Sequence, residues 1–130
     1  MNLPEELIAL LREPSTCFLA TSMPDGSPQM TMTWVDTDGE HIMINTVQGH
    51  QKLRNVDRDP RVAVSVCDPA DPSRYYSVRG QVVDITTEGG PEHIEALAKR
   101  YTGAPYPWYG GRDQVRVILT IEADKINSMG

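Results

Sequence analysis

The sequence predicts a mainly β fold, a small barrel of about six antiparallel strands with flanking helices. Stretches in which apolar residues alternate with smaller or polar ones recur along the chain, and turns that contain Asp-Gly separate the first of them. Only a few stretches carry apolar residues at helical spacing. Sequential strands with so few helices argue against a doubly wound parallel sheet and favour a barrel.

Length and composition are those of an ordinary globular protein. The 130 residues, 39% hydrophobic and 23% charged, are expected to form one domain over 1–130. No run approaches the roughly 18 apolar residues of a membrane helix, and the acidic N-terminus does not resemble a signal peptide. We therefore expect a cytoplasmic protein with no membrane partner. The net charge of −6 disfavours nucleic-acid binding, so any anion must be bound locally.

The N-terminal half begins with a helix and continues with strands. Pro4 suits the first turn of a helix in LPEELIALLRE (3–13), whose leucines form an apolar stripe together with Ile8. Strands are expected at STCFLATSM (15–23), QMTMTWVD (29–36) and EHIMINT (40–46). The turns PDGSP and TDG between them predict a meander, in which each strand pairs with the next.

The remaining elements mix helix and strand. A helix over Gln51–Arg58 is ended by the Asp-Pro pair at 59–60, because proline disfavours helix in the residue before it. Gly80 predicts a bulge in a long strand, and Gly103 predicts a helix C-cap. The expected segments are a strand at 61–68, a polar loop at 69–73, a strand at 74–87, a helix at 89–103 and a strand at 114–122.

The common catalytic and metal-binding motifs are missing from the sequence. It contains no Rossmann glycine motif, P-loop, HExxH or GxSxG. Cys17 and Cys67 are far apart in strand-like stretches, and no histidine lies at metal-ligand spacing, so two buried thiols are expected rather than a zinc site or a disulfide. No nucleophile or carboxylate pair is identifiable, which favours a bound cofactor as the source of any chemistry.

Positive charge is concentrated in VQGHQKLRNVDRDPR (47–61), against the sign of the whole chain. Six of the twelve Lys and Arg residues lie between Lys52 and Arg79. Leu53 and Val56, three apart, are expected to face the core and to leave the cations of this helix exposed. The concentration of positive charge on one short helix of an acidic chain therefore needs an explanation.

Two interpretations of this helix stay open on the residues alone. In the first, it is a solvated surface helix whose arginines pair with Asp57 and Asp59. In the second, it binds an anion, because a helix N-terminus beside basic side chains favours phosphate. Side-chain and backbone donors for such an anion precede the helix at Asn45, Thr46, Gln48 and Gly49.

These motifs carry a resemblance to a known family. The stretch PDGSPQMTMTWVDTDGEHIMINT (24–46), followed by a K-x-x-N helix that ends in RDPRVAVSV (58–66), resembles the pyridoxamine 5'-phosphate oxidase-like split barrels. Within them the chain is most similar to the actinobacterial branch that uses the deazaflavin coenzyme F420. YYSVRGQVV (75–83), LAKRYTG-x-PYPWY (97–109) and RVILTIEADKI (116–126) match that branch in order and spacing. The resemblance extends from about Pro4 to Ile126.

The resemblance implies a site for the cofactor phosphate on the basic helix and the strand before it. The implied residues are Asn45, Thr46, His50, Lys52 and Asn55, with Lys52 the strongest candidate. Many relatives have arginine where His50 stands, so the hold on phosphate is expected to be weaker or pH-sensitive here. F420 has a longer anionic tail than FMN, and Arg54 and Arg58 are the residues expected to favour it.

The resemblance also implies where the ring and the substrate lie. Gln29, Met30 and Thr31 are expected to flank the tricyclic ring, whereas core packing is expected for Met32 and Trp34. Tyr75 or, in particular, Tyr76 is expected to line the cofactor pocket. Trp108 and Tyr109 are expected to contact the substrate, on a segment that is either a lid or a dimer contact. Arg79 is expected to form a cross-strand ion pair.

The implied protein is a homodimeric oxidoreductase. It is expected to transfer a hydride between F420 and an unsaturated organic substrate, with orientation and a dry pocket as its own contributions. One alternative keeps the fold and binds FMN as an oxidase or reductase. Another is a carrier of F420 without turnover, because no residue is identifiable as a proton donor.

Overall fold

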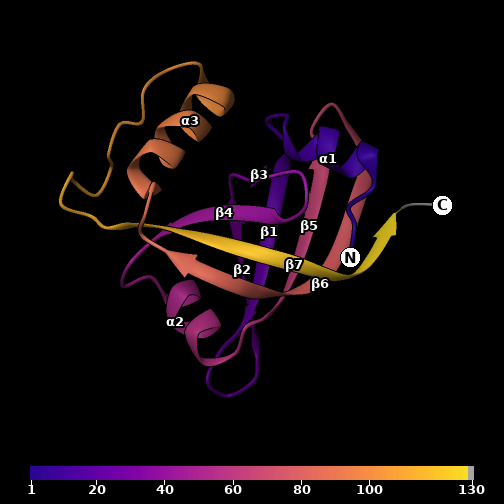
Figure 1. Ribbon diagram of the computed structural model, residues 1–130, viewed down its shortest axis with the longest axis horizontal. Coiled ribbons are helices and arrows are strands. Elements are labelled where there is room, and N and C mark those ends of the chain that lie inside the picture. The colour runs from indigo at the N-terminus through magenta and orange to yellow at the C-terminus, as the bar shows by residue number, and fades with distance from the viewer. Residues whose placement is uncertain (129–130) are drawn as a thin grey trace.

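The computed structural model of the protein describes residues 1–128, which form one curled antiparallel sheet with three helices (Figure 1). The sheet has seven strands in the order β2-β1-β5-β6-β7-β4-β3. The elements are α1 (Glu5–Leu11), β1 (Thr16–Ser22), β2 (Pro28–Thr33), β3 (Asp36–Thr37), β4 (Ile42–Val47), α2 (Gln51–Arg58), β5 (Arg61–Asp68), β6 (Asp71–Thr86), α3 (Gly90–Thr102) and β7 (Arg116–Ser128).

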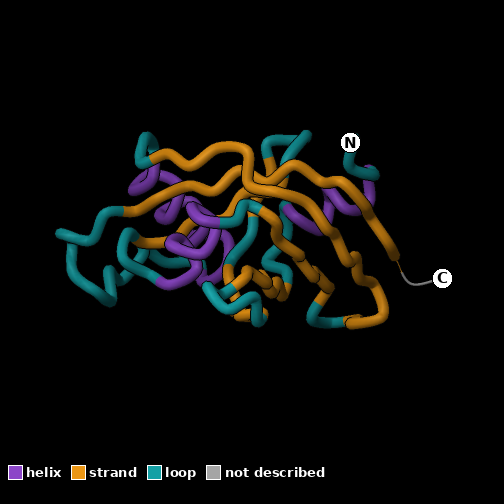
Figure 2. The backbone as a smooth tube through the Cα atoms, turned by 90° about the horizontal axis from the view of Figure 1, so that it is seen from below, coloured by secondary structure: helices purple, strands orange, loops and turns teal. Residues whose placement is uncertain are grey.

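The predicted mainly β barrel with flanking helices is confirmed, and its form is an open half-barrel. Figure 2 shows how strongly the sheet curves. Leucines of α1 are fully buried with valines of β5 and isoleucines of β4 and β7 in one apolar core. Alternation along the strands produces that core, because successive side chains point to opposite faces of a sheet. The seventh strand, two-residue β3, was too short for the sequence pattern to predict.

The predicted meander is wrong beyond its first turn. PDGSP joins β1 and β2 as expected, with Phe18 opposite Met32. The TDG turn instead joins β3 and β4, and β2 and β4 lie far apart in the strand order. The chain leaves β2 after Thr33, and the backbone N–H of Val35 then donates to the hydroxyl of Tyr101 on α3. A contact with a later helix therefore ends the strand pairing.

The hairpin of β5 and β6 also differs from the expected polar loop at 69–73. β6 begins at Asp71, so only two residues separate it from β5. Gly80 marks a bulge as predicted, since the pairing register of β6 with β7 shifts there. A Cβ at Gly80 would lie 2.1 Å from the backbone oxygen of Glu122, so only glycine fits.

Helix α2 has the predicted bounds, and α3 ends at Gly103, which adopts a φ of +74° as a glycine C-cap. At the other end of α3, a Cβ on Gly90 would lie 2.4 Å from the backbone oxygen of Arg116. This glycine lets the start of α3 approach β7 closely, and α3 and β7 together line a pocket. No helix within residues 1–128 is long and apolar enough to cross a membrane.

Candidate functional site

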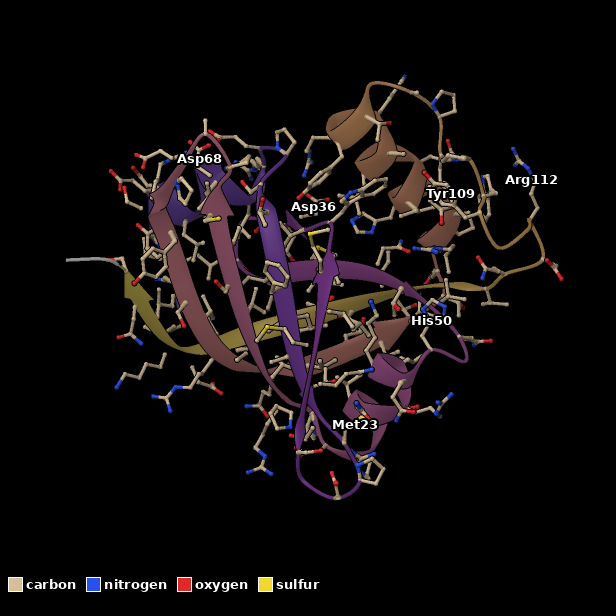
Figure 3. The ribbon with its side chains drawn as sticks, turned by 180° about the vertical axis from the view of Figure 1, so that it is seen from behind. Met23, Asp36, His50, Asp68, Tyr109 and Arg112 are labelled. Atoms are coloured by element: carbon tan, nitrogen blue, oxygen red, sulfur yellow. The ribbon has the colours of Figure 1, made fainter. Side chains whose placement is uncertain are left out.

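A pocket of about 230 Å³ opens where α2, α3, β4 and the start of β7 meet. Its walls combine apolar and aromatic side chains with two cations and one amide. The lining residues are Met32, Thr33, Trp34, Asn45, Lys52, Ile94, Leu97, Tyr106, Tyr109 and Arg116. Figure 3 shows Tyr109 and His50 on one side of the molecule, with Asp68 at the opposite side.

The N-terminus of α2 lies open beside this pocket. His50 is its N-cap residue, and no side chain caps the helix. Gly49 turns the chain into the helix with a φ of +94°, a left-handed conformation that favours glycine. The first N–H groups of a helix have no intrahelical acceptor and carry partial positive charge, so they can donate to an anion.

The solvated-helix interpretation predicted ion pairs that do not form among residues 1–128. Asp59 pairs with Arg61, at 2.8 Å, rather than with a cation of α2. Arg54 donates to the backbone oxygen of Gly49, and Arg58 donates to the backbone oxygen of Ser22. Lys52, half-buried at the pocket, has no carboxylate within 4.0 Å in this part of the chain. The cations of α2 are thus left without acidic partners.

Arg116, which was not predicted from the sequence, is the most buried cation of the pocket. It is 7% exposed, and its Nε donates to Oδ1 of Asn45 at 2.7 Å. Its guanidinium lies 5.3 Å from the ring centre of Tyr106 and donates to the hydroxyl of that residue at 3.4 Å. Strand register brings it here, because Arg116 pairs with Val47, just before α2.

The cations at the pocket repel one another. Burial lowers the pKa of Lys52, and the charge of Arg116 lowers it further. Burial lowers the pKa of His50 as well, with additional contributions from Lys52, Arg116 and Arg54. The pKa of Arg116 is also lowered by burial. A bound anion would offset both effects, because opposite charge favours the protonated forms.

Two buried hydroxyl groups lack a hydrogen-bond partner within residues 1–128. They are Oγ1 of Thr31 and Oγ1 of Thr46. Both threonines were predicted to contact a cofactor, and buried polar groups in native proteins are almost always satisfied. Neither threonine lines the pocket, whereas the free helix N–H groups and the cations without acidic partners in the described chain fit a negatively charged ligand. In the same part of the chain no group of three or more His, Cys, Asp or Glu could hold a metal ion.

Asn45 holds the floor of the pocket in place. Its Nδ2 donates to the backbone oxygen of Gly90 at 3.0 Å and lies 3.1 Å from Nδ1 of His93. Nε2 of His93 in turn lies 3.1 Å from Oδ2 of Asp36. Burial would raise the pKa of Asp36, but hydrogen bonds from His93 and Thr37 and the charge of Arg100 outweigh it and lower the pKa. Asn45 therefore serves the fold and the pocket together.

Asn55, by contrast, is unavailable to a ligand, which corrects the expectation that it binds phosphate. It is fully buried, and its Nδ2 donates to Oγ1 of Thr21 at 3.0 Å and to Oε1 of Gln29 at 3.2 Å. Position 55 lies next to Leu53 and Val56 on the buried side of α2. The amide therefore fastens α2 to β1 and β2, and it also occupies the carbonyl of Gln29.

The predicted ring-flanking residues do not share one face of β2. Gln29 and Thr31 point inward, whereas Met30 is 65% exposed. The expectation of core packing for Met32 is wrong, because this side chain is 69% exposed. Position 32 alternates with the buried Thr33, so it belongs to the outer face. Trp34 is partly buried, stacked on Tyr101 with ring centres 5.1 Å apart.

The outer face of β1, β2 and β6 carries several uncovered apolar side chains. Phe18 is 39% exposed and lies opposite Met32 of β2, and Tyr75 of β6 is 36% exposed. Tyr76 points the other way and packs against the core. It lies opposite Val66 near the β5–β6 turn, so it does not line the pocket of its own chain. Arg79 is exposed and has no ion pair among residues 1–128, so the predicted cross-strand pair does not form.

The aromatic segment after α3 forms one wall of the site. Nε1 of Trp108 donates to Oε1 of Glu95 at 2.9 Å, and Trp108 has a φ of +54°. Tyr106 packs edge-on against both Trp108 and Tyr109. Tyr109 is 82% exposed and lines the pocket, whereas Trp108 does not line it. Of the two predicted substrate residues, the structure brings only Tyr109 to the pocket.

A curled antiparallel half-barrel with flanking helices and a cationic pocket defines the class of split-barrel proteins, which bind flavin-type cofactors. A family model described as pyridoxamine 5'-phosphate oxidase matches residues 3–130. The chain therefore belongs to the pyridoxamine 5'-phosphate oxidase family, whose members are generally oxidoreductases.

Solved structures support the same placement. A protein named F420 reductase is 35% identical, with 96% of this chain and 98% of that chain covered and a TM-score of 0.84. A conserved hypothetical protein from Mycobacterium tuberculosis is 30% identical, with 95% and 82% covered and a TM-score of 0.72. A putative pyridoxamine 5'-phosphate oxidase from Listeria innocua, 20% identical with 95% and 94% covered, shares the fold at a TM-score of 0.71. A search of curated proteins found no match.

Proposed function

We propose that the protein is an F420-dependent oxidoreductase, which transfers a hydride between the deazaflavin and an unsaturated organic substrate. The observation that carries this proposal is the set of cations around the open N-terminus of α2 that lack acidic partners within residues 1–128. The 35% identical neighbour named F420 reductase, which matches over 96% of the chain, favours the deazaflavin.

Lys52, His50 and the N–H groups of α2 would hold the cofactor phosphate. Lys52 reaches it from the half-buried side, and His50 from the exposed side. Arg54, exposed and free of acidic partners in the described chain, would meet the anionic tail beyond the phosphate. Arg58 contributes less in this proposal, because it lies in the last turn of α2, away from the N-terminus that faces the phosphate.

When bound, the deazaflavin supplies hydride chemistry. The chain's own contribution is to bind and orient the reactants beside an apolar wall that excludes water. No side chain of the pocket is identifiable as a proton donor. Solvent serves that purpose in this proposal.

An FMN-dependent enzyme is the second candidate, and the family placement supports it. FMN has the phosphate but lacks the long anionic tail of F420. Arg54 therefore discriminates between the two cofactors, since only a cofactor with the longer tail gains from a cation beyond the phosphate. A third candidate, an F420 carrier without turnover, would bind the cofactor without oxidising it.

A homodimer is part of the proposal. The uncovered side chains of Phe18, Met30 and Met32 form an apolar patch on β1 and β2, and such patches mark interaction surfaces. A second copy seated there would also bring a further set of ring contacts, such as Met30, to a shared site. Light scattering should give twice the chain mass for the wild type, and Met32→Glu should shift the protein toward monomer. A monomeric wild type would exclude this arrangement.

Turnover distinguishes the enzyme from the carrier. Purified protein is mixed with reduced F420 and a panel of quinones, enones and tetrapyrroles, and oxidation of the deazaflavin is followed by absorbance. We expect protein-dependent oxidation with at least one acceptor. Tight binding of F420 without oxidation by any acceptor would support the carrier instead.

A further inference from the structure

We infer that Arg116 is the centre of a second anion site, which binds the carboxylate of a small, single-ring or similarly sized organic acid in the pocket beneath α3. The binding claim stands on the chain alone. That this acid is the hydride acceptor rests on the proposed function.

Arg116 is a buried cation that keeps unused hydrogen-bond donors. A guanidinium has five N–H donors, and two of them are used by Asn45 and Tyr106, which leaves three. Both partners are neutral, and within residues 1–128 no carboxylate lies within 4.0 Å of this 7% exposed side chain. Buried charges in proteins are usually paired, because an unpaired one is costly to desolvate. An anion from outside the chain would supply the missing partner.

Asn45 and Tyr106 hold the guanidinium of Arg116 in place. Asn45 accepts from its Nε while donating to Gly90 and contacting His93, so the amide cannot turn without losing other bonds. The ring of Tyr106 lies against the guanidinium at 5.3 Å. A cation held on two sides in this way is preorganised for a planar, bidentate acceptor such as a carboxylate.

The pocket has a volume and a lining that suit a small organic acid. Its volume of about 230 Å³ exceeds the roughly 150 Å³ of a cavity that holds benzene, but lies below the range of about 300–1,000 Å³ for larger ligands. Ile94 and Leu97 from α3 and the aromatic Tyr109 offer an apolar wall beside the cation. A single ring that bears a carboxylate matches both features.

Lys52 lines the same pocket and connects the two anions. The phosphate proposed above has Lys52, His50 and the α2 N–H groups, so Arg116 remains for the acceptor. Two anions of separate origin would lie on either side of Lys52. Each would offset the burial and the charge of Arg116 that lower the pKa of Lys52, and the burial that lowers the pKa of Arg116. Phosphate and carboxylate share the same chemistry, so the test must separate the two sources.

The test uses the full-length protein with benzoate as the probe and benzamide as a neutral control of the same shape. Tryptophan fluorescence reports binding, because Trp34 lines the pocket. We expect benzoate to bind at least about 10-fold more tightly than benzamide, as a charge-assisted interaction should. At ten times its Kd, benzoate should raise the Tm by about 5 °C. Equal affinity for the two probes, or no response to benzoate, would overturn the inference without any variant.

Variants assign the effect to Arg116. Arg116→Met should weaken benzoate binding by about 10- to 100-fold, whereas Arg112→Met, which removes an exposed cation stacked on Trp108, should leave it unchanged. Undiminished binding by folded Arg116→Met would overturn the assignment.

A titration in the presence of F420 separates the two sources of anion. Protein saturated with F420 should still bind benzoate, and Arg116→Met should retain its affinity for F420 within about threefold. If F420 excludes benzoate, Arg116 belongs to the cofactor phosphate and the acceptor assignment is wrong. If F420 does not bind at all while benzoate does, the proposed function fails and the carboxylate site stands.

Discussion

Replacement of Lys52 by alanine tests the cofactor site most simply, because this ammonium has no acidic partner within residues 1–128 and lies half-buried at the N-terminus of α2. A hydrogen bond to a charged group contributes about 1.5–3 kcal/mol. Loss of the ammonium should therefore weaken binding of F420 about 10- to 150-fold. Because the site is half-buried, most of this loss should persist at raised ionic strength.

Stability should not fall in the Lys52→Ala variant. The pKa of Lys52 is lowered in the folded state, so its charged form is disfavoured by folding, and that penalty is fully present below the folded pKa. Its removal at neutral pH should leave Tm unchanged or raise it. A weaker affinity can then be ascribed to the lost contact and not to unfolding.

Fluorescence titration of both proteins with F420 gives the affinities, and a thermal melt gives the stability. Lys99→Ala, which removes an exposed lysine of α3, is the matched control and should bind as wild type does. An affinity of Lys52→Ala for F420 within twofold of wild type would show that Lys52 holds no phosphate and that α2 is only a solvated surface helix.

Three further predictions concern the helix and its supports. Affinity for F420 should weaken as pH rises from about 5.5 to 7.5, because the pKa of His50 lies below its ordinary value of about 6.5 in the free protein and a bound anion raises that pKa. In titrations at several pH values, His50→Arg should abolish this pH dependence, and the same dependence in both proteins would contradict the prediction. Gly90→Ala should lower Tm by about 7 °C, because the added Cβ would collide with the backbone of Arg116. In the control Gly110→Ala the added Cβ meets only a side chain, so this variant should melt within about 2 °C of wild type. Equal Tm values for the two variants would show that α3 can shift to make room. Asn55→Ala should lower the free energy of unfolding in urea by about 1–3 kcal/mol, because Thr21 and Gln29 lose their hydrogen bonds to the amide. An unchanged urea midpoint would show that α2 does not unfold together with the rest of the domain.

Local patterns were sufficient for most elements of the fold. The helix Gln51–Arg58 has the predicted bounds, because Gly49 before it and the Asp-Pro pair after it act on neighbouring residues only. Gly80 and Gly103 serve as the predicted bulge and cap for the same reason. The predicted pairing of β2 with β4 is wrong, because the route of the chain after β2 depends on a contact with Tyr101, which is far away in the sequence.

The candidate site was only partly predictable. Lys52 could be selected by its position at the start of a cationic helix, which is a local signal. Arg116 begins an ordinary strand and becomes exceptional only because the register of β7 with β4 buries it beside Asn45. Asn55 has the right spacing for a ligand and is nevertheless consumed by bonds to the β1–β2 hairpin. Which polar group faces a pocket and which faces a neighbouring strand is decided by tertiary packing.

Parallel equilibrium titrations of the purified protein with F420 and with FMN decide which of the two cofactors the protein binds. Quenching of the tryptophans reports both ligands, since Trp34 lies at the pocket wall. We expect F420 to bind at least about 10-fold more tightly than FMN, and Arg54→Ala to reduce this preference because only the longer tail loses a partner. Tight binding of FMN with none of F420 would contradict this expectation.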